Sequence, residues 1–320
     1  NDFETESRFI YYGTATRNEY RITRFGRGFS LLNPEHTGDL FVLIKLSSDY
    51  YHGYVLSTDD EINGFLDEFS LSPANTGKII QTGSDQHNRT ADHYFSEFIQ
   101  SLSVEFPSSQ EMSGAARSIF FKLFNNKYDE TENPDHCIVT WTELEYGLFK
   151  SIESIRYEDI LKNGFATVDQ FIESANSILN RRKSRAGKSL ENHLSAIFSA
   201  NSLKFESQPL TEGAKRPDFL FPGGDYYRDP MWSAEKLVFL GAKTTCKDRW
   251  RQILNEANRI STKHLFTLQQ GISSSQLLEM TAEHVVLVVP ELYRNSYPAN
   301  YRDKILSLGE FIAYAKEKTS

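Results

Sequence analysis

Runs of apolar residues separated by polar turns mark the strands that this chain is expected to form. Residues 40–46 and 54–57 are such runs near the beginning of the sequence, and they predict β structure there. Four more runs follow in the second half, at residues 219–221, 237–240, 264–268 and 285–289. Pro290 ends the last run, since proline cannot continue a strand ladder.

The stretches between these runs have apolar residues at helical spacing. Residues 98–122 and 144–178 show this period, most clearly at Leu144, Leu148 and Ile152. Helices that accompany buried strands pack on the faces of a sheet. The predicted fold class is therefore α/β, with a mixed sheet flanked by helices after a β-rich N-terminal segment.

The length and composition leave room for two domains. The chain has 320 residues, of which 39% are hydrophobic, so it can bury two cores. Glycine, serine, threonine and asparagine accumulate between residues 72 and 85, as they do in linkers. We therefore predict a β-rich domain over residues 1–80 and a second domain over residues 85–320.

An acid and an amine stand beside two of the buried runs. Asp218 opens the run at residues 219–221, and Lys243 closes the run that begins at residue 237. If the two strands pair, both side chains reach one end of the sheet. Cleavage of a phosphodiester needs carboxylates that hold a divalent metal and a cation that orients water or phosphate. The pair alone is a weak signal, because a turn containing Pro-Asp and a lysine at a strand end are both common.

A second carboxylate strengthens this interpretation. Residues 244–260 contain good helix formers, with threonines at the start that can serve as an N-cap. In such a helix Arg249 and Glu256 share one face, which places Glu256 near the ends of the strands. A carboxylate at that position suits a metal site together with Asp218.

The tripeptide Lys247-Asp248-Arg249 would lie at the start of this predicted helix. Lysine and arginine hydrogen-bond guanine in the major groove, and aspartate accepts a hydrogen bond from the cytosine amino group. These three side chains therefore suit the reading of G·C pairs. The alternative is a charged first turn exposed to water.

A basic cluster precedes Glu191, the third candidate carboxylate. The whole chain is acidic, with 35 Lys and Arg against 43 Asp and Glu, so contact with phosphates must be local. Glu191 is expected either to point inward beside Asp218, completing a three-carboxylate site, or to close a capping box at a helix start. The cluster is expected to form a loop that contacts the DNA backbone through Arg181, Arg182, Lys183, Arg185 and Lys188.

Together these segments resemble the EcoRII family of type II restriction endonucleases. The resemblance is collinear over nearly the whole chain, and its most specific part is the stretch KTTCKDRWRQILNEA at residues 243–257. The other segments that carry it are residues 16–19, 21–28, 180–191 and 217–222.

The resemblance implies a PD-(D/E)XK fold and Mg²⁺-dependent cleavage of double-stranded DNA at palindromes built on CC and GG around a central base pair. The base-reading positions of the family fall on Lys247, Asp248 and Arg249. Tyr227 matches a tyrosine that is linked to catalysis, although a packing role is an equal interpretation. The catalytic positions fall on Glu191, Asp218, Lys243 and Glu256, with the metal held by Asp218, Glu256 and Glu191.

The resemblance also bears on the N-terminal segment. In the family this region is a B3-like pseudobarrel that binds a second copy of the target and restrains the catalytic domain. The chain begins inside the corresponding domain, so its first strands are expected to be missing or replaced. The candidate contacts to such an effector DNA are Arg17, Arg21, Arg24 and Arg27.

Base flipping is a further property of this group. The family has a run of arginines before its Glu-Tyr pair, whereas this chain has Thr140-Trp141-Thr142 ahead of Glu145-Tyr146. Trp141 could stack on a flipped base, and packing in the core is the alternative interpretation.

The remaining features exclude several other classes of protein. Cys137 and Cys246 lack metal-site spacing, and no apolar run reaches the roughly 18 residues of a membrane span. His264 begins a buried strand, where a structural role is the expected one. We predict a bacterial cytoplasmic homodimer that acts on double-stranded DNA, with a cognate DNA methyltransferase as its functional partner. The alternatives are a non-catalytic DNA-binding regulator with a nuclease-like fold and a nuclease that acts on repair intermediates.

Overall fold

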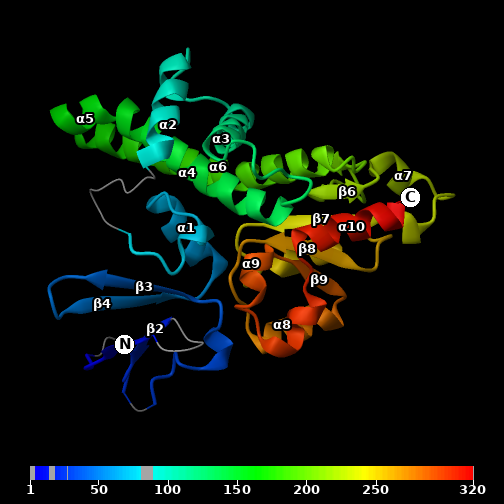
Figure 1. The fold of residues 1–320 in the computed structure, drawn as a ribbon, viewed down its shortest axis with the longest axis horizontal. Helices are drawn as coiled ribbons and strands as arrows, with labels where there is room; N and C mark the ends of the chain where they lie inside the picture. The colour runs from blue at the N-terminus through cyan, green and yellow to red at the C-terminus, as the bar shows by residue number, and fades with distance from the viewer. Residues whose placement is uncertain (1–3, 14–18, 27, 81–88, 320) are drawn as a thin grey trace. The chain divides into compact units, whose positions relative to one another are not determined.

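The computed structural model describes residues 4–13, 19–26, 28–80 and 89–319 (Figure 1). The chain forms two compact units, Asn1–Thr37 and Gly38–Ser320. This division lies well before the predicted linker, so the boundary between residues 80 and 85 stays a prediction. In the described ranges, no helix combines the length and the apolar character needed to cross a bilayer.

The first unit contains an antiparallel pair, β1 (Arg8–Tyr12) and β2 (Glu19–Thr23), in which Phe9 lies opposite Ile22. A short 3-10 helix, η1 (Pro34–His36), follows and is capped by the Asn33 side chain. Of the predicted basic loop, Arg21 lies within β2 and Arg24 follows it with a φ of +67°. Arg17 and Arg27 lie outside the described residues.

The second unit begins with an antiparallel hairpin, β3 (Leu40–Lys45) and β4 (Tyr51–Leu56). Both strands were predicted from the apolar runs, and the prediction is confirmed. Helix α1 (Asp59–Glu68) follows, and it starts at Thr58 and Glu61, whose side chains form a capping box. The predicted linker contains a 3-10 helix, η2 (Pro73–Asn75).

A five-stranded mixed sheet forms the centre of this unit, in the order β5-β6-β7-β8-β9. Strands β5, β6 and β7 pair in antiparallel fashion, whereas β7, β8 and β9 pair in parallel. The mixed sheet was predicted, and four of its strands match the predicted apolar runs. The strands are β5 (Glu206–Ser207), β6 (Phe219–Phe221), β7 (Val238–Lys243), β8 (Lys263–Thr267) and β9 (Val285–Val288).

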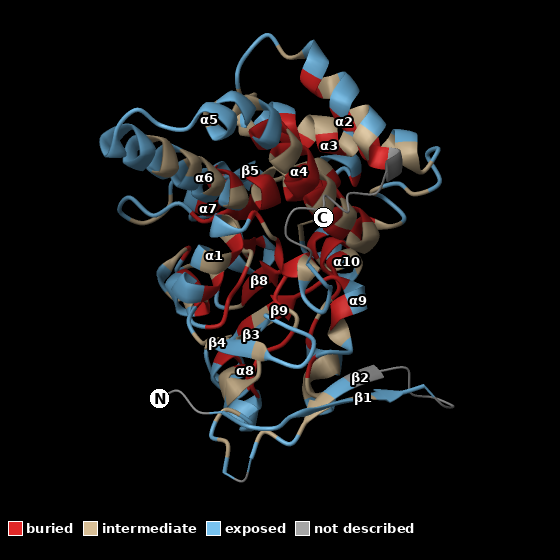
Figure 2. Ribbon diagram, turned by 90° about the vertical axis from the view of Figure 1, so that its left-hand side faces the viewer, coloured by how far each residue is buried: buried red, intermediate tan, exposed pale blue. Residues whose placement is uncertain are grey.

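Side chains on alternate positions of the sheet face two different cores. Phe219, Phe221 and Leu240 pack into the first core, whereas Leu220 and Phe239 pack into the second. Successive residues of a strand point to opposite faces, so a sheet that is buried on both faces has continuous apolar strands. Figure 2 shows this burial along β8 and β9.

Helices supply both cores. The first core takes side chains from α3 (Ser109–Leu123), α4 (Pro134–Arg156), α6 (Val168–Ala200) and α10 (Leu308–Thr319). The second takes side chains from α7 (Gly224–Arg228), η4 (Arg249–Asn255) and α8 (Ser274–Ala282). The remaining helices are α2 (Arg89–Ser101), α5 (Glu158–Asn163), η3 (Ala234–Lys236), α9 (Glu291–Arg294) and η5 (Ala299–Lys304).

Two predicted helical stretches are each divided. The stretch at 98–122 belongs to α2 and α3, because Ser108 caps a new helix with Glu111 as the reciprocal partner. The stretch at 144–178 belongs to α4, α5 and α6. Gly164 ends α5 with a φ of +74°, a conformation that glycine adopts without a steric penalty.

Candidate active site

Asp218 and Lys243 meet at one end of the sheet, as the sequence predicted. Asp218 directly precedes β6, and Lys243 is the last residue of β7, its antiparallel neighbour. The Oδ2 atom of Asp218 accepts hydrogen bonds from the Ala242 amide at 2.7 Å and from Lys243 Nζ at 3.1 Å. The backbone amide fixes the carboxylate, so the lysine is held beside an acid of defined orientation.

Glu191 lies in the middle of a continuous helix. The predicted loop over residues 181–188 and the predicted capping-box role of Glu191 are therefore wrong, because α6 begins at Val168, after its N-cap Thr167, and runs through the whole cluster. A glycine inside a helix costs about 1 kcal/mol relative to alanine. The burial of Arg185, Ser189 and Leu190 along the same helix offsets that cost at Gly187.

The Glu191 side chain points toward the acid and the amine. Its Oε2 atom accepts a hydrogen bond from Gln208 Nε2 at 2.9 Å. Burial raises the pKa of Glu191, and the negative charge of Asp218 raises it further, while Lys243 and Lys188 oppose the shift. These electrostatic effects place Glu191 in the same site as Asp218 and Lys243.

Glu256 reaches the site from a loop. The predicted α-helix over residues 244–260 is wrong: a 3-10 helix, η4, ends at Asn255, and Glu256 follows in an extended conformation. Trp250 and Ile253 are both fully buried. Side chains three residues apart lie on one face of a 3-10 helix, and both of these side chains pack into the second core.

The electrostatic environment of Glu256 also reports the nearness of the other acid. Burial and the charge of Asp218 together raise the pKa of Glu256 to about 7, against the opposing effect of Lys243. Carboxylates that share a site resist ionising together. A divalent cation would relieve this repulsion.

Hard oxygen ligands of this kind fit a divalent metal ion. Asp218 and Glu256 would hold it, with Glu191 close enough to interact with Asp218. The predicted three-carboxylate arrangement is not assembled as one ligand set, because within the described ranges no three Asp, Glu, His or Cys residues are grouped as a metal site requires. Asp218 is instead hydrogen-bonded to Lys243.

The raised pKa of Glu256 predicts that metal binding weakens in acid. Below about pH 7 the carboxyl group holds a proton that the cation must displace, so affinity should rise with pH and become constant above about pH 7. The folded pKa exceeds the ordinary value of 4.5, so stability without metal should fall as the pH rises through this window. Calorimetric Mg²⁺ titrations across this range, with Glu256→Gln as the control, measure the effect. Equal affinity at about pH 5.5 and pH 7.5 would contradict it.

A cleft of about 760 Å³ opens beside Glu191 and Lys243. Arg249 and Tyr146 also line it, and residues 60–68 of α1 form another part of its wall. The cleft therefore connects two of the predicted catalytic residues with one member of the predicted base-reading tripeptide.

The basic cluster divides into internal and exposed members. Arg181 donates to the Tyr157 hydroxyl at 2.5 Å, and Arg182 forms an ion pair with Glu153 at 2.9 Å. Arg185 is buried, and its guanidinium group lies 3.8 Å from the centre of the Tyr146 ring. By contrast Lys183 and Lys188 are exposed, and Lys183 lines the cleft.

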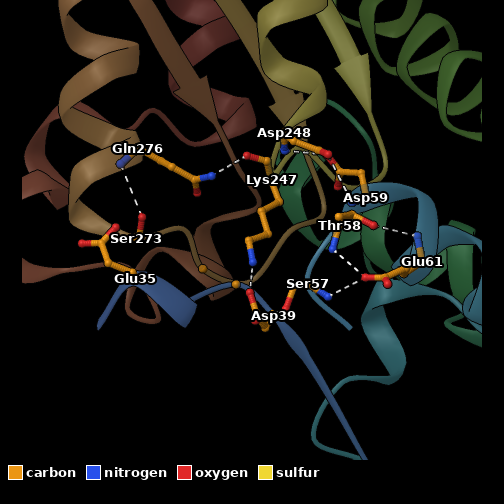
Figure 3. A network of polar contacts seen from close by, with 12 residues as sticks. Glu35, Asp39, Ser57, Thr58, Asp59, Glu61, Lys247, Asp248, Ser273 and Gln276 are labelled. Atoms are coloured by element: carbon orange, nitrogen blue, oxygen red, sulfur yellow. Dashed lines mark hydrogen bonds and ion pairs between the residues drawn. The ribbon is translucent and has the colours of Figure 1, made fainter. Parts of the chain in front are cut away.

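Each residue of the predicted base-reading tripeptide contacts an aspartate from residues 39–60, and Figure 3 shows the contacts of Lys247 and Asp248. Lys247 pairs with Asp39, and Arg249 pairs with Asp60. Asp59 is fully buried and accepts hydrogen bonds from the amides of Asp248 and Arg249, both at 2.8 Å. These aspartates were not predicted, because no local sequence pattern indicates a contact between segments as far apart as Asp59 and Asp248, 189 residues.

Two further candidates are buried. Trp141 is fully buried in the first core, where its ring lies 6.0 Å from that of Phe120, so the core interpretation is the one that its position supports. The Tyr227 hydroxyl donates to Glu212 and accepts from the Arg259 amide, and burial raises the pKa of Tyr227 to about 12. Tyr227 is thus hydrogen-bonded to the backbone of Arg259, in the loop that contains Glu256.

His264 is structural, as predicted. It is 3% exposed, and its ring packs against Phe311 and Tyr314. Burial lowers the pKa of His264 to about 4, so the ring is neutral at physiological pH.

Solved restriction endonucleases share this fold. A metal-depleted Ecl18kI bound to uncleaved, modified DNA matches with a TM-score of 0.55 and 18% identity, over 72% of this chain and 84% of that one. A PspGI–substrate DNA complex matches with a TM-score of 0.54 and 14% identity, over 67% and 93%. A mixed sheet that joins Asp218 to Lys243 thus defines a protein of the PD-(D/E)XK nuclease fold.

Sequence comparison then identifies the family. The chain is 40% identical to the type II restriction enzyme EcoRII of Escherichia coli, over 97% of this chain and 79% of that enzyme. Residues 149–312 match the EcoRII C-terminal model and residues 2–76 the EcoRII N-terminal model. A type II restriction enzyme of Shigella sonnei, SsoII, is 23% identical over 42% of this chain and 47% of that enzyme. The chain belongs to the EcoRII family of restriction endonucleases and is a type II site-specific deoxyribonuclease.

Proposed function

We propose that the chain makes double-strand breaks at a palindrome with CC and GG around a central base pair, of the CCWGG or CCNGG type, by Mg²⁺-dependent hydrolysis. The observation that carries this proposal is the Asp218–Lys243 pair, which has Glu191 and Glu256 within electrostatic reach beside an open cleft. The complexes of Ecl18kI and PspGI with DNA support the substrate class.

The four groups divide the chemistry among them. Asp218 and Glu256 would hold the ion, and Glu191 would assist or hold a second one. Lys243 orients the attacking water or the phosphate from its place beside Asp218. When bound, the ion would supply charge stabilisation for the phosphate and would make water a stronger acid.

Recognition and phosphate binding belong to different groups of residues. Lys247, Asp248 and Arg249 read G·C pairs. Among the basic cluster, Lys183 and Lys188 are best placed for the DNA backbone because they are exposed. Arg181, Arg182 and Arg185 contribute only if they give up their present contacts.

The aspartates that contact the tripeptide support a restraint by the N-terminal part of the chain. Bases can pair with Lys247 and Arg249 only after Asp39 and Asp60 are displaced. We assign residues 1–80 to an effector domain and residues 85–320 to the catalytic domain, in accord with the two family models. The effector DNA would contact Arg17, Arg21, Arg24 and Arg27.

Two-fold symmetry of the target implies two copies of the chain, each cutting one strand. The enzyme then works as a homodimer in the bacterial cytoplasm, with a cognate DNA methyltransferase that protects the host sites. Flipping of the central bases belongs to the same proposal, but the buried Trp141 is not positioned to receive them.

Arg249→Ala is expected to lose about 1–3 kcal/mol of discrimination at one guanine. The reason is that alanine removes the bidentate donors to the O6 and N7 atoms of that base. Competition binding with single-base variants of the target measures the loss. The control is Arg251→Ala. Arg251 lies on the same 3-10 helix as Arg249, and its exposed side chain forms an ion pair with Glu279. Equal discrimination in both variants would contradict the assignment.

A cleavage assay separates this function from a non-catalytic DNA-binding regulator. Supercoiled plasmid should be cut into discrete fragments with Mg²⁺ and should stay intact with EDTA. Specific binding without any cut would favour the regulator, and random degradation would favour a nuclease of repair intermediates.

A further inference from the structure

Lys263, the first residue of β8, is a buried cation outside the group of residues assigned to catalysis. It is only 4% exposed, and a buried charge is costly unless it is paired or hydrogen-bonded. Its Nζ atom donates to two backbone carbonyl oxygens, those of Glu256 and of Ala257, the latter at 2.5 Å. The buried ammonium group therefore holds the backbone of a residue that belongs to the metal site.

The turn at Glu256 needs such a partner. The last carbonyl groups of a helical segment have no N–H donor within that segment. Helix η4 ends at Asn255, one residue before Glu256. Ala257 has a φ of +49°, a left-handed conformation that residues other than glycine seldom adopt. The backbone at this point is thus held in place by tertiary contacts.

Other polar groups complete the anchoring of this turn. Lys215 Nζ donates to the Asn255 carbonyl at 2.5 Å, and the Glu212 carboxylate accepts from the Asn258 amide at 3.2 Å. Lys263 is the buried member of this set, whereas Lys215 and Glu212 are more exposed. The contact of Lys263 with the Glu256 and Ala257 carbonyl groups thus holds the turn from the interior of the protein.

Burial lowers the pKa of Lys263 to about 8, and the negative charges of Glu212 and Glu256 oppose this shift. The contribution of Lys263 to the site is therefore geometric, because its side chain holds the backbone of Glu256.

We propose that Lys263 is a positioning residue of the metal site: its ammonium group holds the Glu256–Ala257 turn and thereby sets where the Glu256 carboxylate meets the divalent ion. This inference rests on the proposed function, which makes Glu256 a metal ligand. Removal of a group that contacts and orients a metal ligand usually lowers metal affinity or activity by about 10–100-fold.

The test is Lys263→Met, which keeps an apolar side chain in the buried position and removes the ammonium group, whose Nζ atom lies 5.0 Å from the centre of the Phe239 ring. Calorimetric titration of the full chain with Mg²⁺ should give a dissociation constant raised by about 10–100-fold. The Mg²⁺ concentration for half-maximal plasmid cleavage should rise in parallel, and saturating Mg²⁺ should recover most of the rate. Binding to the target without metal should stay unchanged.

His264→Leu is the matched control, because the next residue of β8 is equally buried but packs against Phe311 and Tyr314 on the opposite face. It should lower the melting temperature without changing Mg²⁺ affinity. Mg²⁺ affinity of Lys263→Met within twofold of the unmodified chain, or an equal loss in both variants, would overturn the proposal.

Two further results keep the test decisive. Lys263→Gln, which is smaller and neutral, takes the place of Lys263→Met if that variant does not fold, and the same loss of affinity is expected. Failure of the proposed function is recognised separately, since the unmodified chain would then show no Mg²⁺-dependent cleavage at all.

Discussion

Lys243→Ala is expected to abolish DNA cleavage while specific DNA binding is retained. Removal of one positioned electrostatic group from an active site costs about 10²–10³-fold in rate. Lys243 is the cation that contacts Asp218, and it also opposes the raised pKa of Glu191 and of Glu256. Its loss therefore removes the group that orients the water or phosphate and weakens the metal site. Single-turnover cleavage with Mg²⁺ and gel-shift binding with Ca²⁺ measure the two effects.

Lys204→Ala is the control for this substitution. Lys204 is an exposed lysine whose contact is the Tyr226 hydroxyl, so its removal should leave cleavage unchanged. Asp218→Asn should match Lys243→Ala, because both variants remove one half of the same pair. Cleavage by Lys243→Ala at more than about one tenth of the normal rate would refute the site assignment.

Glu145→Ala is expected to destabilise the protein by about 3–5 kcal/mol. Glu145 is fully buried between α4 and α6, 3.0 Å from His193 Nε2 and 3.7 Å from Arg185 Nη1. Burial lowers the pKa of His193 despite the neighbouring carboxylate. Removal of the carboxylate leaves the buried Arg185 guanidinium group without its ion-pair partner. Urea unfolding measures the change.

Glu143→Ala on the same helix is the comparison. Its carboxylate is partly exposed and pairs with Lys78 at the surface, and a surface ion pair contributes about 0–1 kcal/mol. A similar loss of stability in both variants would mean that the buried pair has no special role. Glu145 is then a structural residue, while the neighbouring Tyr146 lines the cleft.

The buried strands and the acid and amine at their ends were predictable because their signals are local. Continuous apolar runs define β6, β7 and β8, and polar residues at the run ends locate Asp218 and Lys243. Pairing of neighbouring strands then brings acid and amine together without any knowledge of distant contacts. The same reasoning placed His264 correctly at the start of a buried strand.

The errors arose where tertiary contacts override local preference. Residues 249–255 favour an α-helix by propensity, but burial of Trp250 and Ile253 and the Asp59 carboxylate at the amide groups hold a 3-10 helix instead. The cluster at residues 181–188 looked like a loop because it is charged. In the structure Arg185 is buried, so that part of α6 packs as helix.

Contacts between distant segments gave no sequence signal. Asp39, Asp59 and Asp60 have nothing in their neighbourhoods that predicts a pairing with residues 247–249. Lys263 likewise begins an apolar run and would pass for an exposed strand end. The structure instead shows it buried beneath the turn that carries Glu256.

Asp218, Lys243 and Glu256 are proposed to cut DNA at one defined palindrome. Digestion of plasmid DNA of known sequence with Mg²⁺, followed by sequencing of the cut ends, tests it most directly. We predict ends that all map to sites with CC and GG around a central base pair, and their alignment would define the central and flanking bases. Ends scattered without a common sequence, or cut sites that lack CC and GG, would contradict the account.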